Sequence, residues 1–131
     1  MSPDFRPLTF KKALGNTGEK LVADFLHNLG FKILERNYSI RGGEIDIIAQ
    51  KKDLISFVEV KTRSTDYFSL SEIITPSKQR KIIFTAQHFI MHKKITDCIL
   101  RFDVALLIKK SDADFKIEFI ENAFAPMHNA Y

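Results

Sequence analysis

The sequence is poor in cysteine and has no long apolar run, and both absences narrow the classes of protein it can belong to. Cys98 is the one cysteine among 131 residues, which excludes an internal disulfide and a cysteine-rich zinc site. Its apolar neighbours favour a small hydrophobic side chain over a nucleophile. No apolar run approaches the ~18 residues of a membrane span, and the N-terminus lacks the apolar core of a signal peptide. We therefore expect a cytoplasmic protein with no membrane partner.

The composition is that of one soluble globular domain. Hydrophobic residues make up 45% of the chain and charged residues 27%, enough apolar content to build a core at this length. The net charge of +4 is a weak indication of a polyanionic partner, because Lys and Arg displace counterions from phosphate backbones. We expect a tail over residues 1–14, a domain over residues 15–124 and a second tail over residues 125–131.

Two amphipathic patterns predict helices. The first begins near Asn16 or Thr17 and ends at Gly30, a residue suited to a helix C-terminus. Its apolar positions cover one arc and are Leu21, Val22, Phe25, Leu26 and Leu29. The second helix begins at Thr75-Pro76, since threonine caps a helix and proline suits its first position. Its apolar stripe consists of Ile82, Ile83, Ala86, Phe89 and Ile90.

Short apolar runs between turn residues predict five strands, over residues 31–37, 44–50, 54–61, 99–108 and 115–124. Residues 38–43 read as a turn around Gly42-Gly43, and residues 62–74 as a loop. The tight polar connection at 51–53 makes its two flanking strands an antiparallel hairpin. The run at 99–108 is almost entirely apolar, which indicates burial on both faces. The order of elements predicts an α/β fold with a mixed central sheet flanked by helices.

Three charged residues interrupt the apolar strands of the hairpin. Glu59 and Lys61 share one strand face by alternation, and pairing of the hairpin can bring Asp46 beside Glu59. Two neighbouring carboxylates raise each other's pKa unless a cation lies between them. Mg²⁺ suits such a pair, because it prefers oxygen ligands and often binds one or two carboxylates together with phosphate. Lys61 would then lie near a bound water or a phosphate and offset developing negative charge.

Two further polar residues have both a structural and a functional interpretation. Glu19 falls at the rim of the first helix's apolar arc and can face the sheet, but Asn16 and Glu19 also have capping-box spacing. Gln79 falls within the stripe of the second helix, where it can position a phosphate or a water. An ordinary polar residue at a helix start is the interpretation we favour for Gln79.

Basic residues flank this constellation in the sequence and can form a rim along a nucleic-acid backbone. They are Arg36, Arg41, Arg63 and the Lys78-Arg80-Lys81 cluster. Any single one of them is more often simply solvated. His88 and His92 project away from the apolar stripe, so we expect exposed side chains and not metal ligands. Asp103 can pair with Arg101, Lys61 or a backbone amide, and its spacing does not decide among them.

Several motifs together resemble the bacterial YraN-type family, over residues 13–124. They are Gly18-Glu19, Arg36-Asn37, Gly43-Glu44-Ile45-Asp46, Phe57-Val58-Glu59-Val60-Lys61-Thr62-Arg63, Arg101-Phe102-Asp103-Val104 and Asn122-Ala123-Phe124. The family consists of small predicted nucleases with the restriction-endonuclease-like PD-(D/E)xK fold, similar in outline to archaeal Holliday-junction resolvases. The resemblance implies Asp46, Glu59 and Glu19 as metal ligands and Lys61 as the catalytic lysine. Ile45 replaces the proline that names the motif, as in many members of this fold.

The residues and the resemblance together predict an endonuclease that depends on Mg²⁺ or Mn²⁺ and acts on DNA, with branched or structured DNA as a candidate substrate. Lys78 and Gln79 join the three arginines as expected nucleic-acid contacts. A homodimer would suit symmetric cutting of two strands. Two alternatives stay open. One is a non-catalytic nucleic-acid-binding or protein-interaction module on the same fold, and the other is a purely structural cluster of salt bridges.

Overall fold

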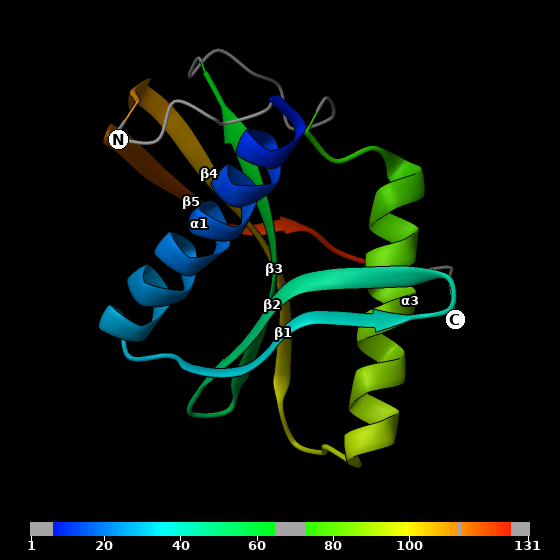
Figure 1. The fold of residues 1–131 in the computed structure, drawn as a ribbon. Coiled ribbons are helices and arrows are strands. Elements are labelled where there is room, and N and C mark those ends of the chain that lie inside the picture. The colour runs from blue at the N-terminus through cyan, green and yellow to red at the C-terminus, as the bar shows by residue number, and fades with distance from the viewer. Residues whose placement is uncertain (1–6, 65–72, 113, 127–131) are drawn as a thin grey trace.

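The computed structural model describes the backbone of residues 7–64, 73–112 and 114–126, and the side chains of these ranges from residue 18 onward. Within them the chain forms two long helices and five strands (Figure 1). In chain order these are α1 (Pro7–Asn28), β1 (Lys32–Ile40), β2 (Gly43–Lys51), β3 (Leu54–Arg63), α3 (Pro76–Lys93), β4 (Ile99–Ser111) and β5 (Asp114–Phe124).

The strands form a single mixed sheet in the order β1-β2-β3-β4-β5. Three of its four pairings are antiparallel, and β3 and β4 are parallel because the connection that contains α3 crosses over between them. The helix α1 packs on one face and α3 on the other, which gives three layers (Figure 1). The predicted α/β three-layer fold of the restriction-endonuclease-like type is confirmed.

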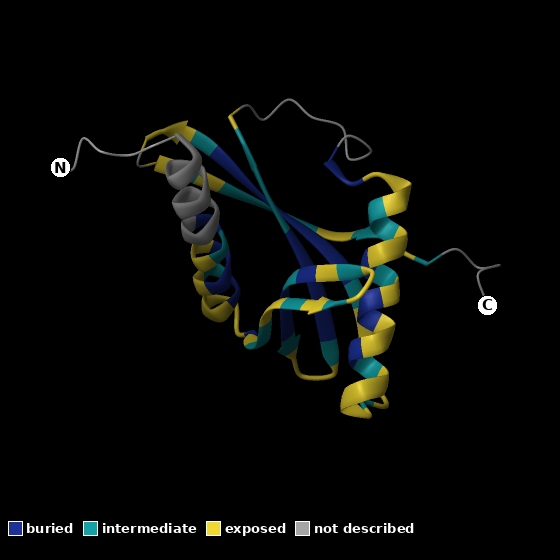
Figure 2. Ribbon diagram, turned by 45° about the vertical axis from the view of Figure 1, so that its right-hand side comes forward, coloured by how far each residue is buried: buried dark blue, intermediate teal, exposed yellow. Residues whose placement is uncertain are grey.

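The core divides between the two faces of the sheet. On one side α1 contributes Val22 and Leu26, and on the other side α3 contributes Ile82, Ala86 and Phe89. The central strands are buried along their middle, as Figure 2 shows in dark blue. Residues 104–108 of β4 are buried without a break, so the prediction of burial on both faces is confirmed. Cys98 packs at the edge of the α3-side core as a hydrophobic side chain, as expected.

The start of α3 follows its sequence signals. The Thr75 side chain accepts a hydrogen bond from the Lys78 backbone amide at 3.2 Å, and Pro76 takes the first helical position. The helix ends at Lys94, which adopts a left-handed conformation. No helix in the described ranges of the chain combines the length and the apolar character needed to cross a bilayer.

The predicted start of the first helix is wrong. The helix α1 begins at Pro7 and not near Asn16, so residues 7–14 of the predicted tail are helical, while residues 1–6 and 127–131 lie outside the described residues. Proline suits a first helical turn, and no second proline follows it before Asn28. Two glycines within the pattern weaken a helix by about 1 kcal/mol each and made its true start hard to recognise.

The buried face of α1 also differs from the predicted arc. Leu21 and Leu29 are 37% and 44% exposed, whereas Ala23 is buried. A Cβ atom on Gly18 would lie only 2.7 Å from Leu107 Cδ1, so the helix axis passes very close to β4 at this residue. Gly18 and Ala23 thus face the sheet together with Val22 and Leu26, and Leu21 and Leu29 lie at the exposed edge of the helix.

The β1–β2 hairpin is longer than predicted and leans against α3. The strand β1 continues to Ile40, past the predicted end at Asn37, and Gly42 turns the chain with a φ of 104°. A Cβ atom on Gly43 would collide with the Thr85 hydroxyl and lie 2.8 Å from the Lys81 carbonyl oxygen. The tip of the hairpin therefore rests directly on α3, as the two strands in Figure 1 show.

Candidate active site

The candidate site lies where β2 leaves β3. The paired register of these strands ends at Ile47 and Val58, while the pairing of β3 with β4 continues to Arg63. Beyond this point β2 pairs with β1 alone, and two-stranded ribbons twist more strongly than wider sheets. Ile45 and Ile48 consequently join the same α3-side core, which strict alternation along a strand would forbid.

Asp46 lies where β2 separates from β3, and a backbone group of β3 holds its side chain. Its Oδ2 atom accepts a hydrogen bond of 2.8 Å from the Val60 amide. The Glu59 carboxyl, of which only 5% is exposed, lies close enough to raise the pKa of Asp46. The sequence prediction that the hairpin would place Asp46 beside Glu59 is therefore confirmed. A carboxylate fixed by backbone on one side and facing a second carboxylate is prepared to share a proton or a cation.

The electrostatics of Asp46 follow from this position. Burial, the negative charge of Glu59 and, more weakly, the charge of Glu19 raise the pKa of Asp46 from 3.8 to about 7, against a lowering effect of the Val60 amide. Near neutral pH the Asp46 carboxyl is therefore partly protonated. A divalent cation would take the place of that proton, because it relieves the same repulsion.

Two ammonium groups converge on Glu59 from different elements. Lys61 Nζ lies 3.4 Å and Lys78 Nζ lies 3.3 Å from the same Glu59 Oε2 atom. Lys61 was expected here because it shares a strand face with Glu59. Lys78 comes from the first turn of α3, and the sequence analysis predicted for it only a contact with nucleic acid. The pair sets two positive charges beside the two acids.

Glu19 reaches the site from α1. Its Oε1 atom lies 3.7 Å from Arg36 Nη2, and it is buried without a hydrogen-bond donor among the described residues. The capping-box interpretation is wrong, because Asn16 and Glu19 both lie in the interior of a helix that begins at Pro7. A buried carboxylate oxygen without a donor costs free energy unless a cation or a water satisfies it.

The donor set fits a hard divalent cation. Within the described residues, no three acidic, histidine or cysteine side chains already surround one point as metal ligands. Glu59 instead has two lysine ammonium groups beside it, and Glu19 has the Arg36 guanidinium. Three carboxylates that repel one another, one of them with an unsatisfied oxygen, nevertheless form the oxygen-rich set that Mg²⁺ or Mn²⁺ prefers.

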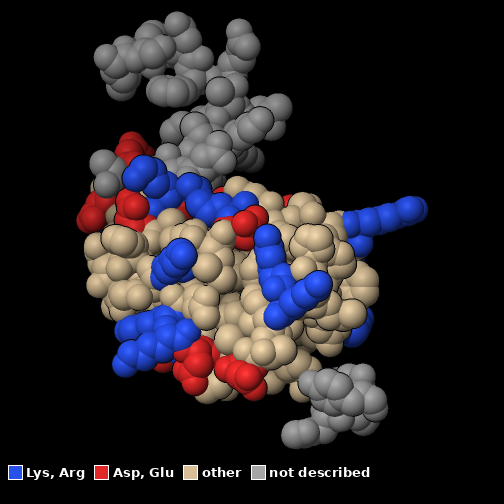
Figure 3. Space-filling model, turned by 90° about the horizontal axis from the view of Figure 1, so that it is seen from below, with Lys and Arg blue, Asp and Glu red and all other residues tan. Residues whose placement is uncertain are grey.

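The other residues predicted to contact nucleic acid do not gather at one place. Arg41 is exposed in the β1–β2 turn, Arg63 ends β3 with its guanidinium donating to the Thr62 carbonyl at 2.9 Å, and Arg36 is exposed beside Glu19. The Gln79 side chain donates to the Ile74 carbonyl at 3.2 Å, which supports its structural interpretation. The face that Figure 3 shows carries both basic and acidic side chains, and the basic ones form separate groups rather than one continuous patch.

Three residues singled out from the sequence lie apart from the site. His88 and His92 are exposed and stacked with ring centroids 5.9 Å apart, as expected of solvent-facing side chains. Asp103 is fully buried and accepts hydrogen bonds from Arg101 Nε, the Asn122 amide and the Ser56 hydroxyl. Of its three candidate partners, Arg101 and a backbone amide are correct, and Lys61 binds Glu59 instead.

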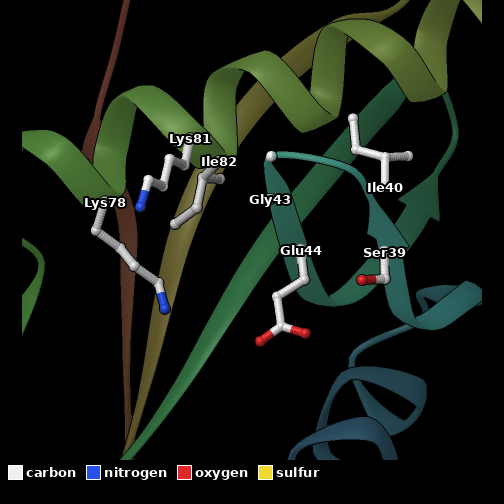
Figure 4. Close-up of a pocket in the computed structure, with 8 residues that line it drawn as sticks. Ser39, Ile40, Gly43, Glu44, Lys78, Lys81 and Ile82 are labelled. Carbon is white, nitrogen blue, oxygen red and sulfur yellow. The ribbon is translucent and has the colours of Figure 1, made fainter.

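A hollow of about 390 Å³ adjoins the site between the β1–β2 turn and α3 (Figure 4). Lys78 and Lys81 line it from α3, and Glu44 lines it from β2. Glu44 was not among the predicted site residues. The shared strand face of Glu44 and Asp46 was the available signal, but the bend of the hairpin toward α3 cannot be recognised from alternation.

Comparison with known proteins identifies relatives over most of the chain. The model of the uncharacterised protein family UPF0102 matches residues 18–107, which include all four predicted catalytic residues. Relatives called UPF0102 protein occur in Caldicellulosiruptor saccharolyticus, 41% identical over 87% of this chain and 98% of the relative, and in Clostridium botulinum, 46% identical over 86% and 94%. A third, from Geotalea daltonii, is 43% identical over 86% of this chain and 90% of the relative. These names state no activity.

Proposed function

We propose that this chain, which belongs to the uncharacterised protein family UPF0102, is a divalent-metal-dependent endonuclease that hydrolyses phosphodiester bonds of DNA. The observation that carries the proposal is the convergence of Asp46, Glu59 and Glu19 with the Lys61 ammonium where β2 leaves β3. Here the part-buried Asp46 carboxyl faces Glu59 and Glu19 with a raised pKa, and Glu19 keeps a buried oxygen without a hydrogen-bond donor among the described residues.

The three carboxylates are the residues that would hold the cation. A divalent cation at such a site polarises the phosphoryl oxygen and lowers the pKa of a bound water. The Val60 amide keeps the Asp46 carboxylate oriented toward Glu59, so the two ligands need little rearrangement before binding. Glu19 supplies the third carboxylate from α1, which packs on the face of the sheet opposite to α3.

Lys61 is the residue proposed to act on the reacting phosphate. Its ammonium lies 3.4 Å from Glu59 Oε2 and is partly exposed, so it can reach both the acids and a bound strand. From there it offsets the negative charge that develops on the phosphate during attack by water. Lys78 and Arg36, which contact Glu59 and Glu19, are placed to hold neighbouring phosphates of the same strand.

A cleavage screen tests the proposal. Duplex, flap, four-way-junction and single-stranded DNA are incubated with Mg²⁺ or Mn²⁺ and the wild-type chain, Lys61→Ala or the exposed-lysine control Lys20→Ala. We expect cleavage of at least one substrate, lost by about 10²–10³-fold in Lys61→Ala and retained in Lys20→Ala. Equal activity in Lys61→Ala would place the activity at another site or in a contaminant.

The same screen addresses the remaining parts of the proposal. Binding without cleavage under any metal condition would favour the non-catalytic nucleic-acid-binding module. A two-fold dimer is proposed only as the arrangement that would cut two strands symmetrically, and sedimentation of the chain with and without the preferred substrate tests it.

A further inference from the structure

The hollow beside the candidate active site has a composition that a phosphate alone does not explain. Its α3 wall carries the Lys78 and Lys81 ammonium groups, and its β2 wall carries the Glu44 carboxylate (Figure 4). Within the described residues, neither Lys81 nor Glu44 takes part in an ion pair. Two cations attract a phosphate, but a carboxylate on the facing wall repels one, so the complete ligand also carries a hydrogen-bond donor.

Lys78 connects the hollow to the acids. Its ammonium lies 3.3 Å from Glu59 Oε2, and its side chain also lines the hollow. A strand with one phosphate at the acids can therefore place a neighbouring nucleotide in the hollow. Ile40 and Ile82 supply apolar surface from both walls. The volume of about 390 Å³ falls within the range of sites for small organic molecules.

We propose that the hollow binds one unpaired nucleotide of the substrate strand. Its phosphate lies on Lys78 and Lys81, its base lies against Ile40 and Ile82, and an exocyclic amino group of the base donates to the Glu44 carboxylate. Cytosine, adenine and guanine carry such an amino group and thymine does not. A base within a duplex is stacked and paired and cannot enter. This inference rests on the proposed function and narrows its substrate to strands with unpaired nucleotides.

The first experiment measures base preference without turnover. Fluorescein-labelled strands of twelve deoxycytidines or twelve thymidines are titrated with the chain in EDTA, and binding is followed by fluorescence anisotropy. We expect the deoxycytidine strand to bind about fivefold more tightly to the wild type. Glu44→Gln should bring this ratio close to one, because a glutamine amide can also donate to the thymine carbonyl. Asp53→Asn, an equal change of charge in the turn between β2 and β3, should keep the ratio.

The second experiment tests the phosphate contact. Each phosphate contact to a single strand contributes about 0.7 to the slope of log affinity against log salt concentration. Lys81→Ser should reduce that slope by about 0.7 for both strands and leave their affinity ratio unchanged. Lys93→Ser, an exposed lysine in the last turn of the same helix, should leave the slope as it is.

The outcomes separate this inference from the proposed function. An affinity ratio near one in the wild type, a ratio unaffected by Glu44→Gln, or an unchanged salt slope in Lys81→Ser would each overturn the inference. A matched duplex that binds as tightly as the single strand with the same dependence on Lys81 would overturn it too. If the expected preferences appear and no metal supports cleavage, the binding site stands and the endonuclease proposal fails.

Discussion

Two buried acid clusters in the same sheet have opposite surroundings. Asp103 is 0% exposed and faces hydrogen-bond donors: Arg101 Nε at 2.9 and 3.0 Å, the Asn122 amide at 2.8 Å and the Ser56 hydroxyl. Asp46 faces one backbone donor and two other acids. Both carboxylates interrupt apolar strands, and the sequence left the partner of Asp103 undecided. The difference teaches that burial alone does not single out a candidate functional acid, and that an acid facing other acids is the informative feature.

The surroundings of Asp103 also explain its location. It lies where the register of β4 and β5 shifts between Phe102 and Val104, and Asn122 opposite has a φ of 53°. The Asp103 carboxylate accepts a hydrogen bond from the Asn122 amide, and this bond compensates for the interrupted backbone hydrogen bonding between β4 and β5 at the bulge. The cluster around Asp103 therefore stabilises the pairing of β5, the last strand, with β4. The cluster around Asp46 is the candidate site.

The largest expected effect is on the structural cluster. Asp103→Ala should lower the free energy of unfolding by about 3–5 kcal/mol, because the part-buried Arg101 guanidinium keeps only the exposed Glu121 carboxylate and the Asn122 amide and Ser56 hydroxyl lose their acceptor. Urea denaturation in EDTA measures this loss. Asp46→Ala, measured in parallel, should lower stability little or raise it. A small effect of Asp103→Ala beside a large effect of Asp46→Ala would reverse our assignment of the two clusters.

The second prediction concerns the response to metal. Mg²⁺ or Mn²⁺ at a hundredfold excess over its dissociation constant should stabilise the wild type by about 2.7 kcal/mol, seen as a higher melting temperature. Asp46→Ala should abolish the rise, since it removes a ligand. Asp24→Ala, which removes an exposed carboxylate of α1, should retain it. An equal rise in Asp46→Ala would mean that the cation binds elsewhere.

The third prediction follows from the raised pKa of Asp46. The unfolded carboxyl titrates near 3.8 and the folded one near 7, so between these values the folded state holds a proton that the unfolded state has lost. The stabilising contribution is complete below about pH 4 and is lost as the pH rises through 7. Without metal we expect a loss of about 2 kcal/mol across this window, after allowance for solvent screening.

Asp46→Asn isolates this contribution. The amide cannot ionise, so the difference in free energy of unfolding between Asp46→Asn and the wild type should grow as the pH rises from 4 to 8, in favour of the variant. Denaturation curves in EDTA across this range provide the measurement. A difference that stays constant with pH would show that Asp46 titrates normally in the folded state.

Local patterns were sufficient to predict the framework of the site. The tight connection at 51–53 fixes the hairpin register, and that register places Asp46 beside Glu59. Alternation places Lys61 on the face of Glu59. Thr75 and Pro76 mark the start of α3 by capping chemistry that acts within four residues. Each of these features depends on neighbours along the chain, and a sequence reports such neighbours directly.

The features that the sequence did not reveal depend on distances between layers. Lys78 contacts Glu59 because of where α3 crosses the sheet, and Glu44 lines the same hollow as Lys78 and Lys81 because the hairpin packs on α3 at Gly43. Exposure of Leu21 likewise follows from how closely α1 approaches β4 at Gly18. No periodicity along a single element encodes the separation between two elements.

Gly18→Ala has the smallest expected effect of these predictions, and it tests the separation between α1 and β4 directly. In an exposed helix interior, Gly→Ala stabilises by about 1 kcal/mol. Here the new methyl group would lie 2.7 Å from Leu107 Cδ1 in a packed core, and such overpacking costs about 1–3 kcal/mol. We therefore expect Gly18→Ala to lower the free energy of unfolding by about 1 kcal/mol, where Lys20→Ala on the exposed side of α1 changes it by less than about 0.5 kcal/mol.

The same substitution links the packing of α1 to the acids, because Glu19 follows Gly18 directly. If the methyl group lifts α1 from β4, the Glu19 carboxylate moves away from Asp46, and the rise in melting temperature with Mn²⁺ should shrink in Gly18→Ala and stay unchanged in Lys20→Ala. Thermal melting of both variants with and without Mn²⁺ decides this. A stabilised Gly18→Ala with a full metal response would show that Leu107 yields to the methyl group and that the glycine does not set the position of Glu19.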